Sequence, residues 1–219
     1  MIKIKIMTIM FISLLNFFGC KEKSTNKTVS DIQINKQIEN SIETFLNRPV
    51  YENLDLNILN SIHDDYLEQT IIDNIFCKLD TNSSSYEENY SIITALSNGR
   101  QAIFATWGLE AEVNNGGFNQ YFFNSFSSGQ YAEEARDGFR LIGAEKHANL
   151  TQRAIDTYMK NIEYYKQFND GTLESFNKSY ENDPLEKIDK EFFTLKSLEN
   201  LSKLRISYIR KHIDEFIDN

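Results

Sequence analysis

The chain has 219 residues, of which 41% are hydrophobic and 25% charged, and its formal net charge is −9. These values are ordinary for one globular domain and exclude a disordered chain, a collagen-like repeat and a disulfide-dense scaffold. The acidic charge argues against direct binding to nucleic acid. The content of 16 Phe and 11 Tyr against 2 Pro and 9 Gly favours long helices over a turn-rich β sandwich.

Residues 1–19 are typical of an export signal, because Lys3 and Lys5 precede an apolar run that is too short to remain as a membrane span. The run ends in Gly19 and Cys20, which resemble a bacterial lipobox whose cysteine thiol receives a diacylglycerol. We therefore expect a signal peptide over 1–19 and a protein of the bacterial cell envelope that is anchored to the membrane by lipid on Cys20, in either leaflet. The alternative is a plain export signal with an incidental cysteine.

Residues 20–48 are expected to form a tether that can carry one extra helix. The stretch 21–30 is almost entirely polar, and an apolar stripe at helical spacing then runs from 31 until just before Pro49. Once Cys20 is used, only Cys77 remains, so no intrachain disulfide is expected. Cys77 lies in an apolar helical stretch, which indicates a buried and inert thiol.

The apolar periodicity predicts helices along the rest of the chain, and no stretch alternates as a strand would. The predicted helices cover 54–79, 86–114, 118–124, 131–142, 150–165, a segment that begins at Pro184, and 198–216. The sequence therefore predicts an all-α fold, with a single compact domain of about six to eight helices over 49–219.

Residues that could hold a metal or perform catalysis are scattered. His63, His147 and His212 stand alone, and no phosphate-binding loop or nucleophile elbow occurs in the sequence. We expect no metal, no cofactor and no enzymatic activity.

The segment 112–124 is unusual, and two of its features have a structural use. Gly116 and Gly117 should end the long helix and reverse the chain, since glycine adopts left-handed backbone conformations without strain. Phe118, Tyr121 and Phe122 should then pack the following short helix back onto the long one.

Glu112 lies near the end of a helix, where a carboxylate is disfavoured, and therefore needs a compensating donor. The side-chain amides of Asn115, Gln120 and Asn124 are the candidates. Two interpretations remain open at this point: a buried corner that pins two helices, and a pocket for a peptide or a small polar ligand.

The same segment resembles the recurring pattern Glu-x-x-Asn-Gly-Gly-Phe-x-Gln-Tyr-Phe-x-Asn of a bacterial family typified by a DNA-mimic protein, a domain otherwise of unknown function. The ungapped match comprises Glu112, Asn115, Gly116, Gly117, Phe118, Gln120, Tyr121, Phe122 and Asn124. The resemblance is expected to cover about 49–215. It implies an all-α fold, no known catalysis and, for the typical member, an acidic surface that imitates DNA towards a DNA-binding protein.

Charge is unevenly distributed, with 14 acidic and 4 basic residues over 31–112 against 17 and 14 over 113–219. This asymmetry selects six candidate partner-binding residues in the first half: Asp64, Asp65, Glu68, Asp73, Glu87 and Glu88. We expect a lipid-anchored, acidic, non-enzymatic domain that binds an unidentified protein partner of basic charge. The alternatives are a small-ligand binder or enzyme with a pocket around Glu112, and an immunity factor against a secreted toxin; a homodimer also stays open.

Overall fold

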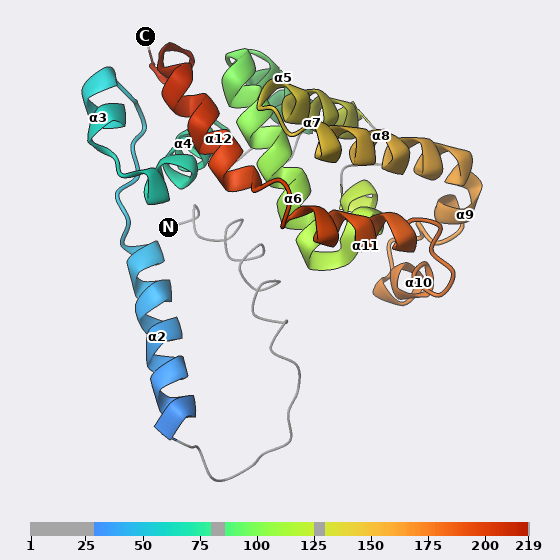
Figure 1. Cartoon of the computed structure of the whole chain (residues 1–219). Helices are drawn as coiled ribbons and strands as arrows, with labels where there is room; N and C mark the ends of the chain where they lie inside the picture. The colour runs from blue at the N-terminus through green and yellow to red at the C-terminus, as the bar shows by residue number, and fades with distance from the viewer. Residues whose placement is uncertain (1–28, 80–85, 125–129, 219) are drawn as a thin grey trace. The chain divides into compact units, whose positions relative to one another are not determined.

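The computed structural model describes residues 29–79, 86–124 and 130–218 (Figure 1). The predicted signal peptide and Cys20 lie outside these residues. The chain divides into two compact units, residues 1–51 and 52–219. In the first unit the described residues form helix α2 (Val29–Leu46), followed by the non-helical stretch 47–51.

The second unit is built from helices alone over the residues that the structure describes, which confirms the all-α prediction. The helices are α3 (Leu56–Ser61), α4 (Asp64–Lys78), α5 (Tyr86–Thr94), α6 (Asn98–Asn124), α7 (Gln130–Leu141), α8 (Glu145–Lys160), α9 (Ile162–Lys166), α10 (Leu173–Lys178), α11 (Glu186–Leu195) and α12 (Leu201–Lys211), followed by the 3-10 helix η1 (Ile213–Phe216). None of the helices in the described ranges is both long enough and apolar enough to cross a bilayer.

The helices are more numerous than predicted because several predicted helices are interrupted by polar side chains that bind the backbone. Nδ1 of His63 accepts from the backbone N–H of Asp65 and separates α3 from α4. Oγ of Ser97 accepts from the backbone N–H of Arg100 at the start of α6. Such local bonds compete with helix continuation, and apolar periodicity does not reveal them.

Helix α6 lies at the centre of the second unit and contacts α4, α7, α11, α12 and η1 (Figure 1). Helix α7 also packs on α8, and α8 on α11. Ile103, Leu109 and Val113 of α6 are fully buried, as are Phe139 of α7 and Phe192 of α11. Burial of each of these large side chains contributes about 1.5 to 3 kcal/mol to stability.

Arg205 of α12 is a buried cation, only 2% exposed, that joins three helices. Its Nε donates to Glu68 of α4 at 2.7 Å, and its Nη2 donates to Glu110 of α6 at 2.5 Å. The two carboxylates thus compensate the burial of the guanidinium, and the pairing fixes α12 against α4 and α6.

The end of the chain is tied to the same helices through Asp218. Its carboxylate binds Lys78 of α4 at 2.8 Å and Arg100 of α6 at 2.6 Å. Burial alone would raise the pKa of Asp218, but the hydrogen bonds from these two cations outweigh it and lower the pKa to about 2. Arg100 also donates to the carbonyl oxygen of Phe216, so the turn of η1 is held in place.

Candidate functional site

Two of the six candidate partner-binding residues are exposed on the first turn of α4. The side chain of Asp65 is 80% exposed and that of Asp64 is 59% exposed. Asp64 accepts from Nε of Arg210 at 2.8 Å, while the same guanidinium donates to the carbonyl oxygens of Leu59 and Ile62. Arg210 therefore fixes the connection between α3 and α4 and with it the position of the acidic turn.

Glu68 and Asp73 do not belong to that surface, which corrects the prediction for these two residues. Glu68 accepts from Arg205, and its side chain is 14% exposed. Asp73 is 4% exposed and accepts from Nε2 of Gln69 at 2.9 Å. The prediction was wrong here because α4 is buried on most of its circumference, so a polar residue in its middle does not mark a solvent face. Glu87 and Glu88 belong to α5, but the structure does not describe their side chains.

The predicted chain reversal at Gly116 and Gly117 is present as a kink within α6. Gly116 has φ −155° and ψ 23°, and Gly117 has φ 76° and ψ −177°. The backbone N–H of Phe118, freed by the kink, donates to Oδ1 of Asp189 in α11 at 2.8 Å. Tyr180 donates its hydroxyl to the carbonyl oxygen of Gly116 at 2.9 Å. The kink is thus anchored from two later segments of the chain.

Glu112 has two of the three donors that the sequence suggested. Its Oε2 accepts from Nε2 of Gln120 and from Nδ2 of Asn124, both at 2.8 Å. In the described part of the chain, Asn115 makes no such bond to it. The carboxylate therefore bridges the two halves of α6 across the kink, which is a structural role.

The rings of the motif pack on other helices as well as on their own. Phe118 and Phe122 are buried, and so is Tyr121. Phe118 meets Phe192 of α11 edge to face at 5.7 Å, and Phe122 stacks on Tyr158 of α8 at 4.2 Å between ring centroids. The short helix after the kink is consequently held by α8 and α11, where the sequence had predicted only the long helix as its partner.

Two carboxylates that sequence reasoning missed lie beside the kink, Asp183 and Asp189. Oδ1 of Asp183 accepts from the hydroxyl of Tyr165 at 2.7 Å and from the N–H of Leu185 at 2.9 Å. Burial raises the pKa of Asp183, and it raises the pKa of Asp189 to about 6. A signal for Asp183 existed in its place directly before Pro184 at a helix start.

Asp189 should make the stability of the domain depend on pH. Because its pKa is higher in the folded chain than the value of about 4 in an unfolded one, the folded state is favoured below pH 4 and loses this advantage as pH rises through 6. Asp189→Asn keeps an oxygen acceptor for Phe118 and cannot ionise, so it should gain about 2 kcal/mol relative to wild type between pH 4 and 7. Urea unfolding across this range measures the difference, and parallel pH profiles of the two proteins would contradict it.

A pocket of about 380 Å³ opens next to the kink. Two buried polar side chains, Asn119 and Ser179, line it and are hydrogen bonded to each other at 2.8 Å. Five aromatic residues contribute to its wall: Phe123, Tyr158, Tyr165, Phe168 and Phe176. Glu112 and Gln120 are not in the lining. This pocket therefore lies on the Asn119 side of the short helix and not around Glu112, where one of the two open interpretations had placed a ligand pocket.

The described residues contain no group of three or more His, Cys, Asp or Glu side chains placed to hold a metal ion. His63 caps α4, and the buried His147 contacts Glu199 through Nδ1 at 2.7 Å. Glu199 also accepts from the backbone N–H groups of Lys146 and His147. Both histidines therefore have structural contacts at the start of a helix, His63 at α4 and His147 at α8.

Comparison with known proteins identifies a family. A family model described as DMP19-like protein matches residues 94–212, a shorter range than the 49–215 expected from the resemblance. The matched range contains the kink, Asp183 and Asp189 but not Asp64 and Asp65. No curated protein and no solved structure matches the chain.

Proposed function

Because the chain belongs to the DMP19-like protein family, we propose that it is a non-enzymatic domain that binds a basic protein partner through acidic side chains and so imitates the charge of DNA. The observation that carries the proposal beyond the family is the exposed pair Asp64 and Asp65 on the first turn of α4. Arg210 holds this turn in place from α12. Carboxylates that are already fixed can meet a cationic groove without the entropic cost of ordering a flexible chain.

We also propose that the protein is located in the cell envelope. The apolar leader and Cys20 support a lipid-anchored protein of the cell envelope, two charges more negative than the full chain once Lys3 and Lys5 are removed. A partner would then be exported or membrane-bound, and a basic secreted toxin is compatible with both the location and the charge. In that case the domain would act as an immunity factor through the same acidic surface.

Charge reversal tests the acidic surface. The variant Asp65→Lys with Glu87→Lys and Glu88→Lys should weaken binding of a basic partner at least about tenfold, because opposite charges across an interface become like charges. A matched control reverses three exposed acids elsewhere, Glu163→Lys, Glu174→Lys and Glu181→Lys. Asp64 is left unchanged because it pairs with Arg210.

Surface plasmon resonance measures how strongly each variant binds a basic partner protein at two salt concentrations. Both variants have the same net charge, so a loss confined to the first one locates the binding surface. An equal loss in both would point to non-specific attraction, and retained binding in the first would refute the acidic surface.

A second candidate function rests on the pocket beside the kink. Its volume of about 380 Å³ is in the range of small-molecule sites, and aromatic walls with a few buried polar groups are typical of them. Asn119 and Ser179 would supply the polar contacts. A thermal-shift screen with a small-molecule library tests this function, and Asn119→Leu should remove any shift that arises in the pocket.

A further inference from the structure

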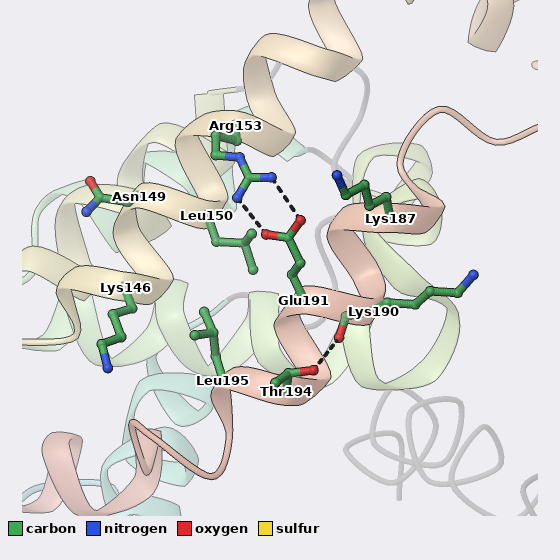
Figure 2. Close-up of a pocket in the computed structure, with 9 residues that line it drawn as sticks. All are labelled: Lys146, Asn149, Leu150, Arg153, Lys187, Lys190, Glu191, Thr194 and Leu195. Carbon is green, nitrogen blue, oxygen red and sulfur yellow. Dashed lines mark hydrogen bonds and ion pairs between the residues drawn. The ribbon is translucent and has the colours of Figure 1, made fainter.

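A groove of about 590 Å³ lies between α8 and α11, on a part of the molecule that neither function above uses (Figure 2). Helix α8 lines it with residues spaced by three and four, Lys146, Leu150 and Arg153 among them. Helix α11 contributes Lys187 and Leu195 at compatible spacing. Residues three and four apart share one face of a helix, so each wall of the groove is a single helical stripe.

The groove is cationic in a chain that is strongly acidic. Its centre holds a bidentate pair, in which Arg153 donates to both carboxylate oxygens of Glu191 at 2.6 and 3.0 Å. Lys190 also lines the groove, but its ammonium is paired with Glu186. Lys146 and Lys187 are exposed, and within the described residues no carboxylate lies within 4 Å of either ammonium. Two positive charges are therefore left for a ligand.

Between the two lysines lie the Arg153–Glu191 pair and two leucines. Figure 2 shows Lys146 and Lys187 at opposite ends, with Leu150 and Leu195 between them. Leu150 is 3% exposed and Leu195 is half-buried. A strongly hydrated ion such as phosphate would leave the half-buried Leu195 uncovered, whereas an amphipathic ligand would cover it and gain the stabilisation of apolar burial.

The length of the groove defines the ligand further. Lys146 and Arg153 lie seven positions apart on α8, or about 10 Å along the helix axis, which corresponds to two turns of an α-helix. An amphipathic helix laid into a groove presents apolar side chains at i+3 and i+4 and can place acids at i and i+7. We propose that the α8–α11 groove binds an acidic amphipathic helix of a partner protein, with one acid near each of Lys146 and Lys187 and leucine-like side chains on the floor.

The probe is a fluorescein-labelled alanine-based helical peptide with glutamates at i and i+7 and leucines at i+3 and i+4. Fluorescence anisotropy should detect saturable binding to the full mature chain that weakens as salt rises. A second peptide, in which lysines replace the two glutamates, should bind at least about tenfold more weakly, because its charges would be repelled by the two lysines.

The protein variants make the test specific to the groove. Lys146→Glu with Lys187→Glu should weaken the glutamate peptide at least about tenfold and should improve binding of the lysine peptide. Lys160→Glu with Lys211→Glu changes the same number of exposed charges outside the groove and should bind like wild type. The first substitutions place acids in the first turns of α8 and α11, where the helix dipole favours them, and thermal unfolding checks that both variants are folded.

Three results would overturn the proposal. The first is equal binding of the two peptides by wild type. The second is the same loss in both lysine variants, which would indicate non-specific attraction. The third is binding to phosphatidylglycerol vesicles, or to inorganic phosphate, that requires Lys146 and Lys187 while the glutamate peptide does not bind, which would assign the groove to a membrane surface or to a small anion.

Discussion

Replacement of Arg205 by alanine is expected to lower the free energy of unfolding by about 3 to 5 kcal/mol. The guanidinium is 2% exposed and satisfies Glu68 and Glu110, whose side chains are only 14% and 23% exposed. Its removal leaves two carboxylates with little access to water and without the cation that compensated them. The loss of the long side chain also removes packing between α12, α4 and α6.

Chemical denaturation measures this loss, and Arg153→Ala is the matched control. Arg153 makes an equally close bidentate pair with Glu191, but its side chain is 53% exposed. An exposed pair contributes at most about 1 kcal/mol, so the control should be nearly neutral. Equal losses in the two variants would contradict the assignment of Arg205 as a buried structural ion.

Replacement of Gly117 by alanine is expected to cost about 3 kcal/mol or more. At φ 76° and ψ −177° essentially only glycine is unstrained, and an L-residue held in this conformation costs about 1 to 3 kcal/mol. A Cβ atom would also lie 2.4 Å from Oδ2 of Asp189, so the carboxylate that accepts from Phe118 would have to move. The kink and the bond that anchors it would both be disturbed.

Gly143→Ala separates these two contributions. Gly143 has φ 82°, but an added Cβ would meet nothing within 4 Å, so this variant should show only the backbone cost. The double variant Gly117→Ala with Asp189→Ala should recover part of the loss, because the clash partner is shortened. Thermal and urea unfolding of the four proteins give the comparison, and equal losses for the two glycine variants would remove Asp189 from the explanation.

The features that the sequence predicted well depend on neighbours in the chain. Apolar periodicity identified the helical class, and Gly116 with Gly117 identified the kink because glycine permits that backbone conformation. The donors to Glu112 could also be predicted from nearby residues, since Gln120 and Asn124 follow Glu112 by 8 and 12 positions.

The features that the sequence did not predict depend on partners far along the chain. Glu68 and Arg205 are 137 residues apart, and Phe118 and Asp189 are 71 apart. A charged residue in a helical pattern looks the same whether it faces water or a buried arginine, which is why Glu68 was assigned to the surface. Asp73 was misassigned because its buried position follows from the packing around α4 and not from its own neighbours in sequence.

The described surface carries one acidic and one basic set of side chains, which would attract different partners. Asp64 and Asp65 would attract a basic partner, whereas Lys146 and Lys187 would attract an acidic segment. The family match covers the cationic groove and the kink but not the acidic turn. Variants of the two surfaces can therefore be combined to ask whether one partner or two are bound.

The most direct measurement of the DNA-like role is a competition experiment. The mature chain is immobilised, proteins from a detergent-solubilised envelope are captured at low salt, and the column is then washed with duplex DNA. If the acidic surface imitates DNA, a basic protein should be released by the duplex and by raised salt, and the Asp65→Lys, Glu87→Lys, Glu88→Lys variant should not capture it. Capture of no DNA-releasable protein, or undiminished capture by that variant, would contradict this role.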